Sequence, residues 1–282
     1  MYCGFFRGFK LLNLYQSLKM TTEPKLHLLV FADDHLCKLG INNYTKMAIK
    51  LVNQAHQLSI FSKIHVYTSE ELFRKYPEYQ EKHIEFYKKN FAEQKFKGYG
   101  YYLWKPFLIW KTLCEIPEND VLIYTDVGCE FHVAGKPRLL EYLQMQQADI
   151  HKNFFFDGLY EIKDWTKKDT MLFFGAEDLA TSHALDVVPG LLLTSNNNHN
   201  RFFFKLWYDS CCEYHLVDDS PSITPNESYF KDHRHDQSIF SILVRKLCSS
   251  ATHNLFHEIQ FNEFWNNPLY GKYPFSIQTN RG

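Results

Sequence analysis

The stretch NDVLIYTDVGCEF, residues 119–131, decides how the rest of the chain is interpreted. Its apolar run 121–125 predicts a buried strand, and the strand ends in Asp126, Gly128 and Glu130. Asp and Gly are turn formers, so a simple turn is one explanation of this ending. Open α/β sheets, however, present their ligand crevice at the carboxyl ends of strands. The acidic residue at this position is therefore also a candidate for binding chemistry.

The residues upstream of this stretch predict alternating strands and helices. Residues 26–34 (LHLLVFADD) and 63–70 (KIHVYTSE) have the apolar and β-branched character of buried strands, and the amphipathic segment 42–59 between them is typical of a helix. The charged segment 71–97 predicts one or two solvated helices, and residues 105–113 predict another. This alternation predicts an α/β fold with a doubly wound, Rossmann-like sheet in the first half of the chain.

The second half of the sequence is less regular. Residues 190–195 (GLLLTS) predict a strand, residues 200–217 and 235–248 predict helices, and the end from residue 261 onward predicts irregular structure. No internal repeat or low-complexity linker divides residues 26–282. We therefore expect them to form one compact domain.

An N-terminal segment, residues 1–25, precedes this domain. Phe5, Phe9 and Leu12 recur at roughly helical spacing, which predicts a helix docked on the protein's own domain. A peripheral contact with a membrane surface is the alternative. Charged residues such as Arg7 interrupt the apolar residues, so the segment predicts neither a signal peptide nor a transmembrane span.

The composition disfavours several classes of function. The 282 residues carry a formal net charge of −1, which supplies no long-range field for capturing nucleic acid. The seven cysteines include no CxxC pair, which disfavours a zinc ribbon and a disulfide scaffold and favours a reducing compartment, the cytoplasm. Aromatic residues make up 17% of the chain; most should be core, although aromatic faces can also stack on sugars or bases.

Four motifs spread along the chain resemble one family of enzymes. They are GYGYYLWKPFLIWKTL (98–113), NDVLIYTDVGCEF (119–131), VDDSPS (217–222) and DHRHDQSIFSILVRK (232–246). Together they resemble GT-A-fold glycosyltransferases that use nucleotide-diphospho-sugars, of the bacterial and viral surface-polysaccharide type. The chain is also distantly similar to the family 8 transferases, which include glycogenin.

This resemblance implies a fold and an activity. The fold would be a GT-A-like mixed sheet, with residues 26–135 as the donor half and residues 136–282 as an irregular acceptor half. The activity would be transfer of a hexosyl or pentosyl group from a nucleotide-sugar, expected to be a UDP-sugar, to a glycan or another hydroxyl acceptor in polysaccharide biosynthesis. The sequence distinguishes neither the sugar nor retention from inversion.

The departure from the family's metal motif leaves two alternatives open. In the GT-A fold the strand usually ends in Asp-x-Asp, which holds a divalent cation bridging the donor diphosphate. Here Asp126 is at the first position and Gly128 at the third. Either Glu130 or His235 completes a shell for Mn²⁺ or Mg²⁺ around Asp126, or basic side chains neutralise the diphosphate without metal.

The resemblance also implies donor-binding residues. Lys105 lies on the helix that in the distant relatives contributes a basic residue to the donor phosphates; a solvated lysine is the alternative. Tyr102 and Trp104 could stack on the nucleotide or pack in the core. Glycine at position 100 permits unusual backbone angles. The expected donor-binding set is Gly100, Tyr102, Trp104, Lys105, Asp126, Gly128 and Arg234.

The cluster DHRHDQ, residues 232–237, carries the catalytic candidates. It brings acidic, basic and cationic side chains to the start of a predicted helix, where free N–H groups also attract anions. Similar retaining enzymes have an Asp-Gln pair under the donor sugar, so the resemblance implies that Asp236 and Gln237 border the reacting centre. Asp236 could orient donor hydroxyls or act as a base. Asp219, before Pro221, is the third catalytic candidate, with a turn as its alternative.

Two other functions compete with the transferase. The first is a non-catalytic carbohydrate- or nucleotide-binding protein on a decayed transferase fold, and Gly128 in place of the second aspartate is its best support. The second is a glycoside hydrolase, which needs two facing carboxylates and no nucleotide.

Overall fold

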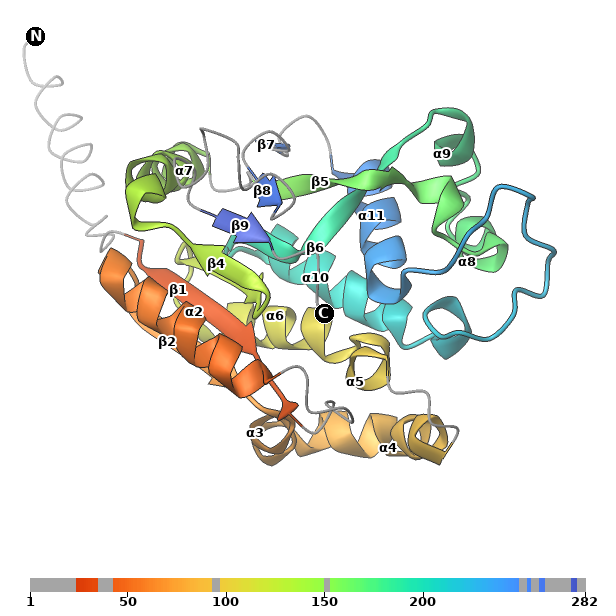
Figure 1. The fold of residues 1–282 in the computed structure, drawn as a ribbon, viewed down its shortest axis with the longest axis horizontal. Coiled ribbons are helices and arrows are strands. Elements are labelled where there is room, and N and C mark those ends of the chain that lie inside the picture. Colours follow the sequence, from red (N-terminus) through yellow and green to blue (C-terminus); the bar gives the residue numbers. More distant parts are fainter. Residues whose placement is uncertain are drawn as a thin grey trace, which may run out of the picture.

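The computed structural model describes residues 24–34, 43–92, 97–149 and 153–248, together with three short strands near the C-terminus. Figure 1 shows how these elements are arranged. The helix predicted in residues 1–25 lies outside the described residues, except for its last two positions, and stays a prediction. No helix in the described ranges is long and apolar enough to cross a membrane.

A six-stranded mixed sheet forms the centre of the fold. Its strands are β1 (Leu26–Phe31), β2 (Lys63–Tyr67), β3 (Val121–Asp126), β5 (Phe154–Glu161), β6 (Leu185–Ser195) and β7 (His253–Asn254). Their order across the sheet is β2-β1-β3-β6-β5-β7. The strands of the first half pair in parallel, as helical crossovers allow, whereas β6 is antiparallel to both β3 and β5. The two predicted halves therefore share one sheet, and their division into donor and acceptor halves stays a prediction.

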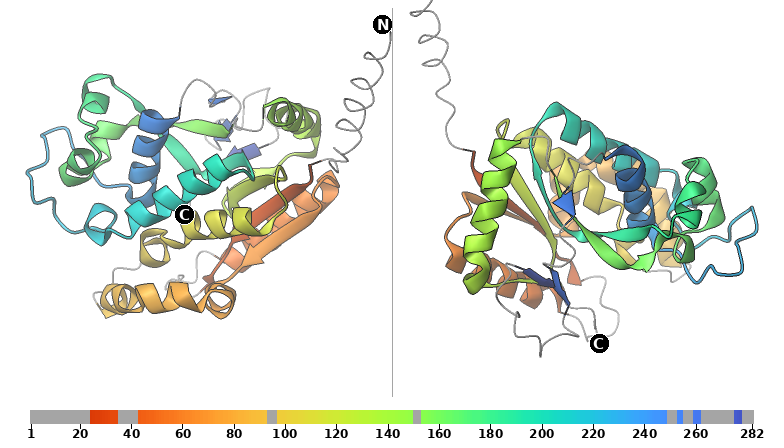
Figure 2. Two further views of the ribbon diagram at one scale, coloured as in Figure 1. Left: turned by 180° about the vertical axis from the view of Figure 1, so that it is seen from behind. Right: turned by 90° about the horizontal axis from the view of Figure 1, so that it is seen from above.

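Helices cover both faces of this sheet, as Figure 2 shows from behind and from above. One face carries α2 (Tyr44–Leu58) and α7 (Lys136–Ala148), and the other carries α6 (Trp104–Glu115), α10 (Asn198–Cys211) and α11 (His235–Leu247). Successive strand residues point to opposite faces, so Leu28 and Leu29 belong to different cores. The predicted α/β fold with a doubly wound mixed sheet is confirmed.

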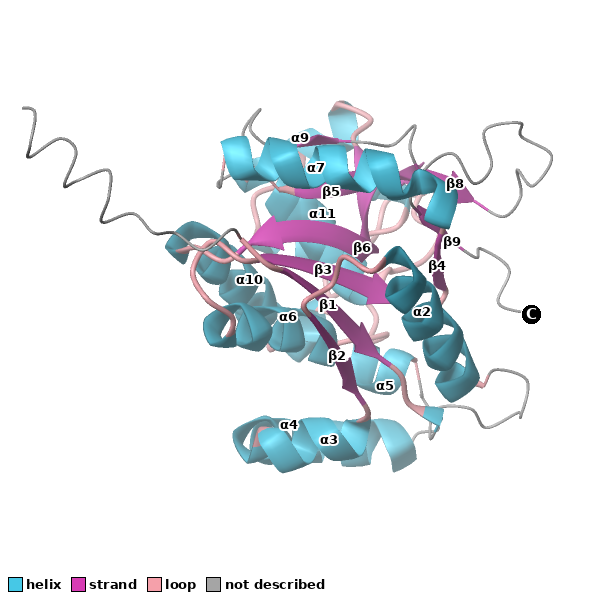
Figure 3. Ribbon diagram, turned by 90° about the vertical axis from the view of Figure 1, so that its left-hand side faces the viewer, coloured by secondary structure: helices cyan, strands magenta, loops and turns pink. Residues whose placement is uncertain are grey.

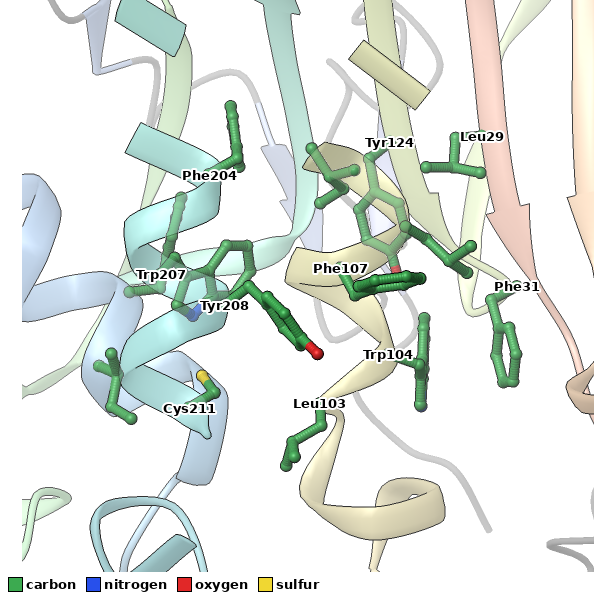
Figure 4. Close-up of a cluster of buried hydrophobic side chains, with 14 of the residues drawn as sticks. Leu29, Phe31, Leu103, Trp104, Phe107, Tyr124, Phe204, Trp207, Tyr208 and Cys211 are labelled. Carbon is green, nitrogen blue, oxygen red and sulfur yellow. The ribbon is translucent and has the colours of Figure 1, made fainter. Parts of the chain in front are cut away.

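The core under α6 and α10 is strongly aromatic (Figure 4). The Phe107 and Tyr208 rings lie 5.1 Å apart, and Trp104 stacks on Phe31 at 3.9 Å. Full burial of one aromatic side chain contributes roughly 1.5–3 kcal/mol. These contacts fix the first turn of α6 against the carboxyl end of β1, which positions the residue after Trp104.

The shorter elements follow local capping rules. The charged segment 71–97 forms two helices as predicted, α3 (Ser69–Lys75) and α4 (Pro77–Ala92). Thr68 and Glu71 form a capping box at the start of α3, and Pro77 begins α4, where its missing N–H is harmless. The remaining helices are α5 (Gly98–Tyr101), α8 (Lys168–Phe173), α9 (Asp178–Thr181) and 3₁₀ turns at Val133–Gly135, Ile162–Asp164 and Tyr214–Leu216.

Two expectations for the second half are wrong. The end of the chain is not irregular throughout: β4 (Cys129–Phe131) pairs with β9 (Phe275–Ile277), which pairs with β8 (Ile259–Phe261). Short strands whose partners are distant in the sequence have little local signal. The helix predicted at 200–217 ends earlier, at Cys211, and the last residues of that range form a 3₁₀ turn.

Candidate active site

A cluster of three charged side chains lies at the carboxyl end of β3. Asp126 is the last residue of β3, Lys105 is the second residue of α6, and Asp236 is the second residue of α11. The Lys105 Nζ atom is 3.3 Å from Asp236 Oδ2 and 3.5 Å from Asp126 Oδ1. The Lys105 and Asp236 side chains are each 3% exposed, and Asp126 is 21% exposed. The structure thus brings together three residues that the sequence analysis singled out separately.

Burial sets the electrostatics of this cluster. It raises the pKa of Asp236 to about 7; the Lys105 ammonium opposes this shift, and the Asp126 charge adds to it. Burial disfavours the charged form of Lys105, but Asp126 and Asp236 outweigh it, so the pKa of Lys105 is raised. Asp236 Oδ2 accepts no hydrogen bond from the part of the chain that the structure describes. Asp236 therefore exchanges a proton near neutral pH beside a permanent cation.

The position of Asp126 depends on two neighbours. The Tyr124 hydroxyl donates a 2.5 Å hydrogen bond to Asp126 Oδ1. On the adjacent strand β6, a Cβ atom at Gly190 would lie only 2.7 Å from Asp126 Oδ2. Glycine at position 190 therefore lets the carboxylate lie against the neighbouring strand. The sequence analysis missed Gly190 as a site residue, because only the pairing of β3 with β6 brings it to Asp126.

The turn before α6 has an unusual backbone. Its residues are Gly98, Tyr99, Gly100, Tyr101 and Tyr102, and all five have positive φ, between 52° and 77°. The left-handed helical conformation costs roughly 1–2 kcal/mol for each residue that is not glycine. Such strain is concentrated at functional sites, where the surrounding structure enforces it. The unusual backbone expected at the glycines is present and extends to three tyrosines.

A second polar cluster lies beside this turn. His235 also has a positive φ of 53°, and its ring centroid is 4.9 Å from that of Tyr101. Its Nδ1–H donates to the Val217 carbonyl at 2.8 Å, which turns Nε2 toward Asp219 Oδ1 at 3.8 Å. Asp219 also pairs with Lys97 at 3.0 Å. Burial lowers the pKa of His235, so its ring is neutral at physiological pH.

The two aspartates of the VDDSPS motif, Asp218 and Asp219, have different partners. Asp219 faces His235, whereas Asp218 faces Lys167, whose Nζ lies 3.3 Å from Asp218 Oδ1 and 3.2 Å from the Ser220 carbonyl. Lys167 is 2% exposed, and its ammonium donates to the carbonyls of Asp218 and Ser220, the residues on both sides of Asp219. The sequence analysis missed Lys167, because a buried lysine and a solvated lysine have the same local pattern.

The other candidates of the late cluster point elsewhere. Gln237 Nε2 donates to Asp186 Oδ2 at 2.6 Å. Asp186, on β6, is 3% exposed, and burial raises its pKa to about 6; no sequence signal marked it. Arg234, predicted to bind the donor, has its guanidinium carbon 4.3 Å from the Tyr160 ring centroid and 4.5 Å from that of Trp165.

The remaining donor candidates have mixed surroundings. Trp104 is 5% exposed and donates its indole N–H to the Gly98 carbonyl at 2.9 Å, so it is part of the core. Tyr102 is half-buried, and Lys105 Nζ lies 5.1 Å from its ring centroid. Gly128 is buried in the turn between β3 and β4. Lys105 Nζ is also 5.9 Å from the Trp104 ring, so both aromatic candidates border the charged cluster, and Tyr102 is the more exposed of the two.

The predicted metal ligands do not come together. Glu130 pairs with Lys50 of α2 at 2.7 Å, and His235 is bonded to the Val217 carbonyl. In the described ranges, no three His, Cys, Asp or Glu side chains are arranged to hold a metal ion. Asp126, Glu130 and His235 therefore do not form such a group of three here, and both this ligand set and the metal requirement stay predictions.

Comparisons with known proteins find similar solved structures but no similar sequence. No family model matches the sequence, and no curated protein matches it. One similar solved structure is a glycosyltransferase involved in the glycosylation of the major capsid of PBCV-1, with 11% identity, a TM-score of 0.49, and coverage of 92% of this chain and 95% of that one. Another is mouse xyloside xylosyltransferase 1 in its apo form, with 10% identity, a TM-score of 0.48, and coverage of 90% and 98%. At these values the similarity carries no conclusion about activity.

Proposed function

We propose that the protein is a glycosyltransferase that moves a sugar from a nucleotide-diphosphate donor to a hydroxyl acceptor. The observation that carries this proposal is the Lys105 ammonium held between Asp126 and Asp236 at the carboxyl end of β3. Open α/β sheets bind ligands at this edge. Burying three charges is costly, which favours a role for them beyond stability. The resemblance of four sequence motifs to GT-A-fold transferases supports the same reaction.

The donor would bind beside Lys105 and Asp126. Negative charge develops on the diphosphate as the glycosidic bond breaks. An ammonium group that is already oriented and shielded from water stabilises this charge without reorganisation. Asp126, the more exposed carboxylate, would accept hydrogen bonds from donor hydroxyls. Tyr102, beside Lys105, would contact the same ligand.

Asp236 would border the reacting carbon of the donor sugar. Its pKa of about 7 suits a group that orients a donor hydroxyl or takes the proton of the acceptor hydroxyl. Gln237 donates to Asp186 Oδ2 and would line the same centre only after its side chain leaves this hydrogen bond. Asp219, on the outer side next to His235, is the alternative base.

The sequence motifs support a narrower form of this proposal. It is a hexosyl- or pentosyltransferase of the surface-polysaccharide type, distantly similar to family 8, that uses a UDP-sugar and a glycan acceptor in the cytoplasm. The narrower proposal also includes a requirement of the transfer reaction for Mn²⁺ or Mg²⁺.

Nucleotide-induced stabilisation tests donor binding. Thermal unfolding of the full chain is measured with UDP, GDP and CMP, each with and without Mn²⁺. A ligand at 100 times its dissociation constant stabilises the folded state by about 2.7 kcal/mol. We expect one diphosphate to stabilise the protein and Asp126→Asn to abolish the effect. Absence of stabilisation by every nucleotide would reject the proposal.

A non-catalytic binding protein is the second candidate, favoured by Gly128 at the third position of the metal motif. Release of UDP from a panel of UDP-sugars, with and without glycan acceptors, separates the two functions. Nucleotide binding without release of sugar from any donor would support the binding protein.

A further inference from the structure

The Arg234 guanidinium packs beside a pair of aromatic rings of the predicted acceptor half. Its guanidinium carbon is 4.3 Å from the Tyr160 ring centroid and 4.5 Å from that of Trp165. The two rings are themselves 5.1 Å apart. Tyr160 lies near the end of β5, and Trp165 directly follows the 3₁₀ turn Ile162–Asp164. Figure 3 shows β5 on the opposite side of β6 from β1 and β3. Arg234 is thus associated with a part of the sheet remote from β1.

Two N–H groups of this cluster lack acceptors. Arg234 Nε and Trp165 Nε1 are both buried and have no hydrogen-bond partner among the described residues. Asp186 attracts Arg234 electrostatically, but its oxygens already accept from Gln237 Nε2 and from the backbone N–H of Tyr160. An unpaired buried donor costs about 1–3 kcal/mol. The cluster therefore offers two donors to the oxygen atoms of a ligand.

Two lysines near Arg234 form ion pairs with carboxylates. Lys163 pairs with Glu161 at 2.8 Å, and Lys231 pairs with Asp164 at 2.7 Å. No such ion pair is found for Arg234 in the described part of the chain. Asp186 is thus the acidic side chain that interacts electrostatically with Arg234, without a close ion pair.

The cluster is rigidly joined to the start of α11. The Trp165 carbonyl accepts hydrogen bonds from the Arg234 backbone N–H at 3.1 Å and from Ser238 Oγ at 2.7 Å. Arg234 precedes Asp236 by two residues, so their Cα atoms are at most about 7.6 Å apart. The main chain that carries Arg234 is therefore close to that of Asp236, which would bring an acceptor sugar held by Arg234 into the neighbourhood of the proposed reacting centre.

We propose that Arg234, Tyr160 and Trp165 form a subsite for the carboxylate of an acidic acceptor sugar, such as a uronic acid. This proposal rests on the transferase function proposed above and specifies its acceptor. The planar guanidinium fork matches a carboxylate in bidentate geometry. The aromatic rings present apolar faces to a sugar ring, and the Trp165 indole adds a further N–H donor.

Matched sugars test the subsite on the full-length protein. Methyl glucuronide and methyl galacturonide are compared with methyl glucoside and methyl galactoside, which lack only the carboxylate, by saturation-transfer NMR titration. We expect at least one uronide to bind at least tenfold more tightly than its neutral counterpart, and Arg234→Gln to remove this difference. Arg234→Lys keeps the positive charge but lacks the planar guanidinium group, so it should retain only part of the difference in affinity between uronide and neutral sugar. The control Arg138→Gln removes an arginine of α7 that pairs with Glu141, and should leave this affinity difference unchanged.

Two outcomes would overturn the subsite. One is equal binding of each uronide and its neutral counterpart by the wild-type protein. The other is loss of UDP-induced stabilisation in Arg234→Gln with uronide binding retained, which would assign the guanidinium to the donor diphosphate. Failure of the transferase proposal is distinguishable, because it is read from nucleotide stabilisation and sugar release in the wild-type protein. Trp165→Phe, which keeps the ring and removes the N–H, should weaken uronide binding if Arg234→Gln fails to fold.

Discussion

The ammonium group of Lys105 lies 3.3 Å from the carboxylate of Asp236, and each side chain is 3% exposed. Lys105 lies in the first turn of α6, three residues after the last of a run of left-handed residues, and Asp236 follows His235, which is itself left-handed. The N-termini of α6 and α11, each next to residues with positive φ, therefore lie together at the carboxyl end of β3. The strain of such left-handed residues persists only where the surrounding packing enforces it, as the aromatic core around Trp104 does here.

Replacing Lys105 by methionine should destabilise the protein and abolish nucleotide binding. The substitution leaves Asp126 and Asp236 without their shared cation, and breaking a buried ion pair costs about 3–5 kcal/mol. Urea unfolding and UDP-induced stabilisation measure the two effects. Lys88→Met is the control, because Lys88 and Glu85 form an exposed pair that contributes at most about 1 kcal/mol. Equal effects of both substitutions would contradict the assignment.

Stability should fall as pH rises toward neutrality because of Asp236. Burial raises the pKa of Asp236 from 3.8 to about 7. Between these values the folded protein keeps a proton that the unfolded chain has released, so this group lowers the free energy of unfolding by up to about 1.4 kcal/mol per pH unit. Above about pH 7 both states are ionised and the contribution is constant.

The variant Asp236→Asn isolates this effect, because it does not titrate. Its free energy of unfolding in urea should change relative to that of the wild-type protein from about pH 4 to pH 7, and the difference should then become constant. Parallel curves over the whole range would mean that Asp236 ionises as an ordinary carboxylate does.

Gly190→Ala should weaken nucleotide binding more than it affects the fold. The added Cβ would lie 2.7 Å from Asp126 Oδ2 and would force the carboxylate to move. A loss of about 1.4 kcal/mol would weaken UDP binding about tenfold. Gly175→Ala is the matched control: its φ is +54° but no atom lies within 4 Å of the new Cβ, so it should reduce stability and leave UDP binding intact. Calorimetric titration of both variants with UDP checks this, and unchanged binding in Gly190→Ala would refute it.

Gly100→Ala should destabilise the left-handed turn. Gly100 has a φ of +77°, and an added Cβ would lie 2.1 Å from the Tyr87 ring. Strain of the left-handed conformation contributes about 1–2 kcal/mol, and overpacking about 1–3 kcal/mol. A double-mutant cycle with Tyr87→Ala separates these contributions, because the smaller side chain should relieve the overpacking alone. Additive effects on urea unfolding would mean that the ring does not obstruct the new methyl group.

The elements with strong local patterns were predictable from the sequence. The helix predicted at 42–59 is α2, the strand at 121–125 is β3, and the helix at 235–248 is α11, each within two residues of its predicted bounds. Periodicity and capping act over neighbouring residues, so the sequence contains them directly. Strand β5 was missed in the less regular second half, and the pairing of β4 with β9 joins segments that are distant along the chain.

The sequence by itself determined the α/β alternation and the kinds of side chain at the end of β3, including Lys105, Asp126 and Asp236 as candidates. Only the tertiary structure decided that these three share one cluster, that Glu130 faces α2, and that Trp104 is core. Local propensity depends on residues within one or two turns, whereas burial, charge pairing and pKa depend on which distant elements pack together. A lysine's local sequence does not say whether water or two carboxylates surround it.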